Sequence, residues 1–211
     1  MSLELCPLCD TVSDVFFQKN KQLYYLCQKC KGIFLSKDLL PSKELERLRY
    51  QKHNNDINNI GYFKFISPII NAVLKDFTAK HTGLDFGAGP EPVISKFLTN
   101  KNYNIKWYDP FFFNSPQLLQ KKYDYIVCCE VIEHFHKPKT NFELLKSMLN
   151  ENGKLYCKTS IFNHNINFNK WYYKNDFTHV FFYQEKTLKT IQKDFGFSDV
   201  IIQDDLITFL N

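Results

Sequence analysis

The chain has 211 residues, of which 44% are hydrophobic and 17% aromatic, so it can hold one ordinary core and a small additional module. It contains no apolar run long enough for a bilayer and no signal-like start, which predicts a cytoplasmic protein that does not enter a membrane. The net charge of +5 arises mostly in residues 1–80, where 12 basic residues face 8 acidic ones, and this surplus only weakly supports nucleic-acid binding.

Four cysteines near the N-terminus form two closely spaced pairs. Cys6 and Cys9 are followed, after 17 residues, by Cys27 and Cys30. Thiolates at this spacing can close a tetrahedral site with no open position, so we predict a structural zinc ribbon over residues 1–40. Two reducible disulfides are the alternative, which a cytosolic chain disfavours.

Residues 41–80 are predicted to form a helical linker. One helix is expected over 42–52, where acidic residues occupy the first turn, and a second over 60–80, where apolar residues recur at helical spacing. The polar stretch 53–56 between them is either a capped connection or a lid over a substrate pocket.

A short apolar strand over 82–86 runs into a glycine turn. Asp85 is followed by Gly87, Ala88 and Gly89, and a helix is predicted over 92–100. Glycine lets the backbone adopt positive φ and lets a ligand approach closely, so this unit is typical of nucleotide-binding α/β folds. The third glycine position of a dinucleotide loop falls on Pro92, which has no N–H for a pyrophosphate and argues against a dinucleotide oxidoreductase.

Further strands and helices alternate along the rest of the chain. Strands are predicted over 103–108, 124–129 and 153–159, helices over 138–150 and 184–195, and a closing strand pair over 198–202 and 206–210. This order predicts a Rossmann-like α/β fold over 81–211, with a mostly parallel sheet and an antiparallel terminal strand. Asp109 ends one strand and Glu130 another, at the edge where such sheets bind ligands, and an acid like Asp109 can accept hydrogen bonds from ribose hydroxyls.

The motifs LDFGAGP, WYDP and YDYIVCCEVIEH, in this order, resemble those of class I S-adenosylmethionine (SAM) methyltransferases. The resemblance covers about residues 80–211, and small bacterial members with an N-terminal cysteine ribbon are similar in arrangement. It implies SAM as the cofactor. The cofactor-binding residues would be Asp85, Gly87, Ala88, Gly89, Asp109, Pro110, Phe111, Cys129, Glu130 and Val131.

The chain departs from the family between Asp109 and Tyr123. Only the 13 residues 110–122 lie there, where a full member has a helix, a strand and another helix. The acidic residue that usually contacts the adenine amino group therefore has no obvious counterpart. Backbone near Cys129 and stacking on Phe111 or Phe112 are the expected substitutes, although these aromatics could equally be core residues.

Methyl transfer needs a base only when the acceptor must lose a proton. The candidates are His134, four residues after Glu130, and His179 with Asp176 in the aromatic stretch 171–183. Asp176 could orient His179 as a base. Alternatively, Asp176 caps the turn, His179 packs structurally, and His134 packs beneath the cofactor.

Methyl transfer from SAM to a small molecule such as a sugar, a quinol or another metabolite is the leading functional hypothesis. RNA methylation using the ribbon and a non-catalytic SAM-binding scaffold are the alternatives. The sequence does not decide the oligomeric state.

Overall fold

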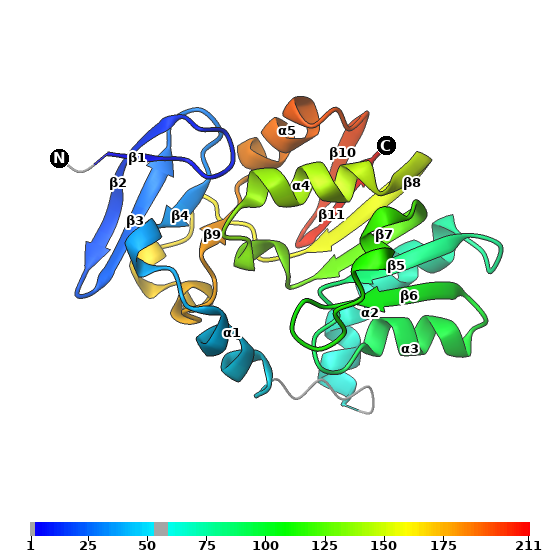
Figure 1. Ribbon diagram of the computed structural model, residues 1–211. Helices are drawn as coiled ribbons and strands as arrows, with labels where there is room; N and C mark the ends of the chain where they lie inside the picture. The colour runs from blue at the N-terminus through cyan, green and yellow to red at the C-terminus, as the bar shows by residue number, and fades with distance from the viewer. Residues whose placement is uncertain (1–2, 53–58) are drawn as a thin grey trace.

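The computed structural model describes residues 3–52 and 59–211, which form two β-sheets and five α-helices. The polar stretch 53–56, predicted to be a linker or a lid, lies outside the described residues. Figure 1 shows the N-terminal sheet beside the larger sheet, with the two connected through the segment that carries β9.

The larger sheet has six strands in the order β10-β11-β8-β7-β5-β6. Four of them, β6, β5, β7 and β8, run parallel, whereas β11 is antiparallel to both of its neighbours. The strands are β5 (Thr82–Phe86), β6 (Asn104–Tyr108), β7 (Tyr123–Cys129), β8 (Leu149–Lys158), β10 (Asp199–Gln203) and β11 (Leu206–Leu210). The predicted mostly parallel α/β sheet with an antiparallel terminal strand is confirmed.

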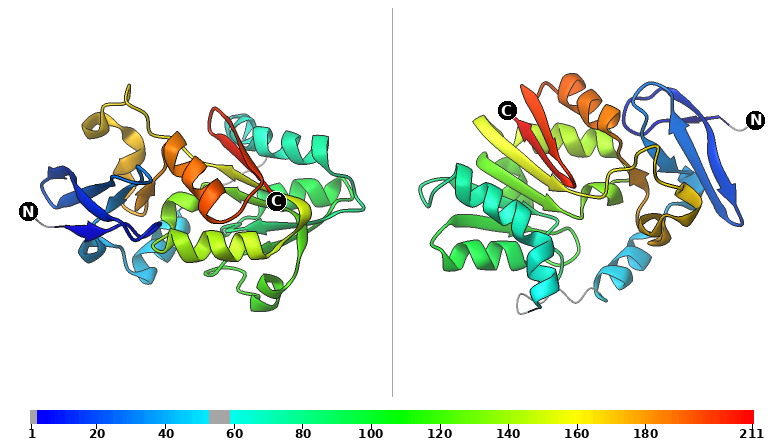
Figure 2. Two further views of the ribbon diagram at one scale, coloured as in Figure 1. Left: turned by 90° about the horizontal axis from the view of Figure 1, so that it is seen from above. Right: turned by 180° about the vertical axis from the view of Figure 1, so that it is seen from behind.

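Helices cover both faces of this sheet, as the alternation of elements predicts (Figure 2). One face packs against α2 (Ile60–Asp76) and α3 (Val93–Asn100), and the other packs against α4 (Pro138–Ser147) and α5 (Glu185–Asp194). Tyr125 and Val127 of β7 point to the first core, and Ile126 and Cys128 point to the second. Each face of the sheet is therefore a separate apolar core.

Several predicted boundaries shift by a few residues. The helix predicted to reach residue 80 ends at Asp76, where Phe77 becomes extended. Strand β8 begins at Leu149, four residues before its predicted start, because the buried Leu149 side chain pairs in register with Tyr123. The antiparallel strand β11 is not at the edge; its side chains are almost all buried, so it lies inside the sheet and the half-exposed β10 forms the edge.

The shortened connection 110–122 contains neither a strand nor an α-helix. It consists of a turn closed by a bridge between Asp109 and Phe113, followed by the 3-10 helix Pro116–Gln120. The truncation predicted from the sequence is therefore present in the fold.

The N-terminal sheet is antiparallel and takes its last strand from far along the chain. It has the order β1-β2-β3-β4-β9, with β1 (Glu4–Leu5), β2 (Val12–Lys19), β3 (Gln22–Cys27), β4 (Ile33–Leu35) and β9 (Phe181–Phe182). Strand β9 belongs to the part of the chain predicted to be the methyltransferase domain. The cysteine module and that domain consequently share one sheet and one apolar cluster.

Among residues 3–52 and 59–211, no helix has both the length and the apolar character that crossing a bilayer requires.

Candidate active site

The carboxyl ends of β5, β6 and β7 bring three acidic side chains to one edge of the sheet. These are Asp85, Asp109 and Glu130, as the sequence predicts. Asp85 is only 4% exposed, and its carboxylate accepts a hydrogen bond from the Ser95 hydroxyl at 2.9 Å. Burial raises the pKa of Asp85 to about 7, although the hydroxyl and amide of Ser95 oppose this shift. A cationic ligand at this position would favour the ionised carboxylate.

The glycine loop after β5 is fixed by backbone hydrogen bonds. Gly87 and Gly89 have φ of 78° and 67°, a region that other residues rarely occupy. The N–H groups of Gly87 and Ala88 donate to the Tyr108 carbonyl at 2.8 and 3.1 Å. A Cβ on Gly87 would also lie 2.7 Å from the methyl groups of Val131, so glycine is required here by both conformation and space.

Asp109 links the glycine loop to the turn that follows β6. One carboxylate oxygen accepts from the Gly89 N–H at 2.9 Å, and the other accepts from the N–H groups of Phe111 and Phe112 at 2.8 and 3.1 Å. Burial raises the pKa of Asp109, while these three N–H groups lower it. The side chain is thus rigidly placed before any ligand binds.

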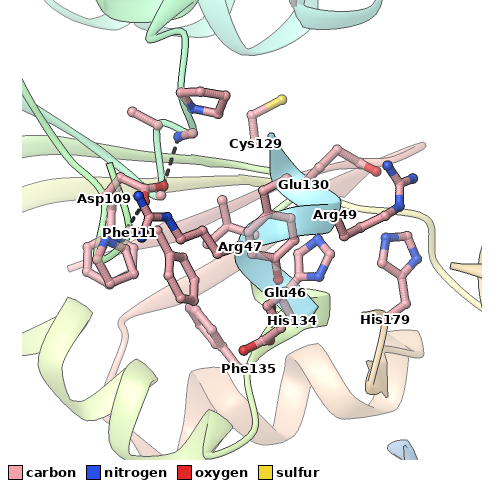
Figure 3. Close-up of a pocket in the computed structure, with 18 of the residues that line it drawn as sticks. Glu46, Arg47, Arg49, Asp109, Phe111, Cys129, Glu130, His134, Phe135 and His179 are labelled. Carbon is pink, nitrogen blue, oxygen red and sulfur yellow. Dashed lines mark hydrogen bonds between the residues drawn. The ribbon is translucent and has the colours of Figure 1, made fainter. Parts of the chain in front are cut away.

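A single cavity of about 1290 Å³ extends from this edge to the histidines of the second half of the chain. Figure 3 shows Asp109 and Phe111 at one end, His134 and His179 at the other, and helix α1 (Lys43–Tyr50) crossing between them. The site residues predicted from the sequence in the methyltransferase region all line this cavity, namely Asp85, Gly87, Ala88, Gly89, Asp109, Pro110, Phe111, Cys129, Glu130, Val131, His134, Asp176 and His179.

Helix α1 is held over the cavity by polar contacts of two residues on one of its faces. Arg49 forms an ion pair with Asp176 at 2.6 Å, and Nε2 of His136 lies 3.1 Å from a carboxylate oxygen of Glu46. The Tyr50 ring lies 5.1 Å from the His134 ring, centroid to centroid, and 5.7 Å from that of Phe111. The first linker helix therefore forms part of the pocket wall.

The two histidines are oriented by backbone carbonyls. Nδ1 of His134 lies 2.8 Å from the Thr178 carbonyl, and Nδ1 of His179 lies 2.7 Å from the Tyr173 carbonyl. A carbonyl can only accept, so the Nδ1 of each ring carries a proton. The two rings are 4.7 Å apart, centroid to centroid.

Asp176 does not occupy the orienting position at Nδ1 of His179. Its carboxylate accepts from the amide and hydroxyl of Thr178, at 3.1 and 2.7 Å, and pairs with Arg49. Burial would raise the pKa of Asp176, but these donors and the nearby charges lower it to about 2. These contacts match the alternative in which Asp176 caps the turn, because its carboxylate is already used by the turn and the helix above it.

Glu133 and Tyr173 are buried site residues that the sequence reasoning did not single out individually. The Tyr173 hydroxyl donates to Glu133 at 2.5 Å, and it also lies 3.0 Å from Glu130 and from the Thr159 hydroxyl. Burial and the charge of Glu130 raise the pKa of Glu133 well above its usual range. The spacing of Glu130 and Glu133 on one turn was the available sequence signal.

The four N-terminal cysteines come together as predicted. Their sulfur atoms all lie within 4.8 Å of one another, with Cys6 3.6 Å from Cys30 and Cys9 3.4 Å from Cys27. Zn–S bonds of about 2.3 Å in a tetrahedron place sulfurs about 3.8 Å apart, so the cluster is compatible with zinc. The predicted alternative of disulfides is not formed, since all four cysteines are free thiols.

Comparison with solved structures supports the fold. An O-methyltransferase family protein from Burkholderia thailandensis aligns with a TM-score of 0.51 and 9% identity, covering 77% of this chain and 60% of that one. A putative O-methyltransferase from Nostoc punctiforme PCC 73102 gives 0.52 and 12%, covering 69% and 56%. Human N-acetylserotonin methyltransferase in complex with SAM gives 0.53 and 14%, covering 82% and 60%. The chain thus spans 56–60% of the length of these structures.

No curated protein sequence matches the chain. A family described as "Methyltransferase domain" matches residues 58–201, which is more than half of the chain. The match includes the glycine loop, the acidic strand ends, His134 and His179. The resemblance drawn from the motifs is confirmed, and the chain belongs to this methyltransferase family.

Proposed function

We propose that this protein transfers the methyl group of SAM to a small molecule bound in the cavity beneath α1. The observation that carries the proposal is the continuity of this cavity. It joins the glycine loop and Asp109 at one end to the histidines at the other. Donor and acceptor would meet in one continuous cavity, and proximity and orientation supply much of the rate of such a displacement.

The cofactor would lie along the edge of the sheet. Asp109, fixed by three N–H donors, has lone pairs left for the ribose hydroxyls. The glycine loop would contact the methionine part, whose charge is complementary to Asp85. The adenine would lie between Phe111 and the backbone from Cys129 to Val131, which line the same end of the cavity.

The acceptor would bind at the histidine end. Since the Nδ1 atoms of His134 and His179 contact backbone carbonyls, Nε2 would be the nitrogen that takes part in proton transfer with the acceptor. Asp176 would contribute indirectly, by holding α1 in place through Arg49.

A small acceptor fits this arrangement because α1 covers the cavity and is tied to its walls. One of the similar solved structures is named an N-acetylserotonin methyltransferase, and another is named an O-methyltransferase family protein. Transfer to a sugar, quinol or related metabolite remains the proposed reaction, with the acceptor to be identified by experiment.

The cysteine cluster would bind a structural zinc ion. Four thiolates leave no open coordination position, so this metal would stabilise the module and not take part in catalysis. Residues 1–40, 41–80 and 81–211 are proposed as the ribbon, the linker with its covering helix, and the SAM-binding domain.

Calorimetric titration of the zinc-loaded protein with S-adenosylhomocysteine tests this function, with NAD as the matched control. Micromolar binding of the first alone is expected and would justify a screen of metabolite and RNA acceptors. The absence of binding would contradict the proposed cofactor. Binding followed by methylation of RNA alone would contradict the small-molecule acceptor.

A further inference from the structure

At the histidine end of the cavity, one fully buried carboxyl group lies close to two imidazoles that line the cavity. Glu133, His134 and His179, here termed the Glu–His–His cluster, each offer a ligand atom, and these atoms all lie within 4.8 Å of one another. Figure 3 shows both histidine rings at the same end of the pocket. Glu133 Oε1 and His134 Nε2 are 3.9 Å apart.

Glu133 is fully buried and only half satisfied. Its Oε1 accepts from the Tyr173 hydroxyl, but its Oε2 has no hydrogen-bond partner among the described residues. A buried carboxylate oxygen without a partner is destabilising, and such an atom in a native protein calls for an explanation, such as an ion. The unpaired oxygen is the independent indication of a ligand at this position.

The charge around Glu133 gives the sign of that ligand. The Glu130 carboxylate shares the same Tyr173 hydroxyl, so two acidic side chains lie against one neutral donor. The nearby cations have acidic partners of their own, since Arg49 pairs with Asp176 and Lys158 pairs with Asp205. A cation would therefore lower the cost of burying these carboxylates.

The histidines are arranged as metal ligands commonly are. Each donates its Nδ1 proton to a backbone carbonyl, at 2.8 Å for His134 and 2.7 Å for His179. In metal sites this outer hydrogen bond fixes the tautomer and orients Nε2 toward the ion. A set of two nitrogens and one oxygen suits first-row divalent ions better than Mg²⁺ or Ca²⁺, which prefer oxygen alone.

We propose that the Glu–His–His cluster binds a first-row divalent cation, such as Mn²⁺, with open positions facing the acceptor. His134 and His179 line the cavity, so an ion between them is accessible from it. The inference rests on the proposed function for its chemical meaning: the acceptor would bind the ion through a hydroxyl oxygen.

Coordination would make that hydroxyl a stronger acid and a better nucleophile. Its proton passes to water, an oxygen lone pair forms the bond to the methyl carbon, and the carbon–sulfur electrons remain on sulfur. The products are a methyl ether, S-adenosylhomocysteine and one released proton. The substrate class is thus an oxygen acceptor.

Mn²⁺ titration of the full-length, zinc-loaded protein, followed by electron paramagnetic resonance, tests the site. Manganese disfavours thiolates, so it leaves the cysteine cluster occupied by zinc. We expect about one bound Mn²⁺ per chain, with coupling to imidazole nitrogen in the pulsed spectrum. The Glu133→Gln and His179→Gln variants should bind Mn²⁺ at least about tenfold more weakly.

His164→Gln is the matched control, because His164 is exposed and lies outside the cavity of the proposed site. Three results would overturn the proposal: no binding of Mn²⁺, binding without coupling to nitrogen, or unchanged Mn²⁺ binding in the Glu133→Gln variant. The spectrum of the unaltered protein decides the matter even if a variant fails to fold. S-adenosylhomocysteine binding, measured separately, decides the proposed function independently of the cation.

Discussion

Asp109 offers the sharpest test of how the cofactor would be held. The change Asp109→Asn preserves the size of the side chain but replaces one acceptor oxygen with a donor NH₂. That NH₂ would face either Gly89 or the pair Phe111 and Phe112, whose N–H groups now donate to the carboxylate. The variant therefore disturbs the glycine loop or the following turn, as well as weakening the bond to a ribose hydroxyl.

The expected loss follows from the worth of a hydrogen bond to a charged group, about 1.5–3 kcal/mol. One such bond to the ribose corresponds to a dissociation constant for S-adenosylhomocysteine raised about 10- to 150-fold. Calorimetric titration measures this change, and thermal unfolding of the unliganded protein reports separately on the loop.

The matched control is Asp204→Asn, in an exposed turn where Asp204 has φ of 55°, which asparagine also tolerates. It should leave the dissociation constant unchanged. If Asp109→Asn folds normally and changes the constant less than about threefold, the ribose assignment is wrong.

Three further outcomes are expected. Tyr173→Phe removes the hydroxyl shared by Glu130 and Glu133 and should lower the free energy of unfolding by about 1–3 kcal/mol in denaturant titrations; an unchanged value would mean that water replaces the hydroxyl. Cys27→Ser should abolish stoichiometric zinc binding, measured by metal analysis, and lower the unfolding temperature, and retention of both would exclude the four-thiolate site. Burial raises the pKa of Asp85 to about 7, above its ordinary value. Between about pH 4 and 7 the native state therefore binds more protons than the unfolded state, so the free energy of unfolding falls as pH rises through this window. A cationic cofactor favours the ionised form, so SAM binding should tighten over the same rise, and a dependence that survives in Asp85→Asn must come from another group.

The local motifs were enough to predict the sheet and one end of the cavity. Asp85, Gly87 and Asp109 act through backbone conformation and through the shared edge of parallel strands, and both follow from residues adjacent in sequence. The shortened segment 110–122 was likewise visible in the chain length alone, and the fold contains the expected truncation.

The histidine end of the cavity could not be predicted in the same way. Nδ1 of His179 contacts the Tyr173 carbonyl. Every residue has a backbone carbonyl, so the pattern of residue types does not indicate which carbonyl a histidine will contact. The Asp-x-x-His pattern suggested a direct pair, yet Arg49, more than a hundred residues earlier in the chain, engages Asp176. The contacts of Asp176 are therefore determined by the distant helix α1 and could not be predicted from the spacing of residues 176–179.

The segment 176–183 connects the cysteine module to the cavity of the methyltransferase fold. Its first part binds α1 through Asp176 and holds His134 through the Thr178 carbonyl. Its last part pairs with β4. The Val180 carbonyl accepts a hydrogen bond from the Leu35 N–H at 2.8 Å, and the Val180 N–H donates to the Glu133 carbonyl at 2.9 Å. His179 lies between these two attachments. The ordering of the ribbon sheet thus constrains the backbone on either side of a histidine in the cavity, so a metal bound only by the cysteines can still affect the geometry of the site.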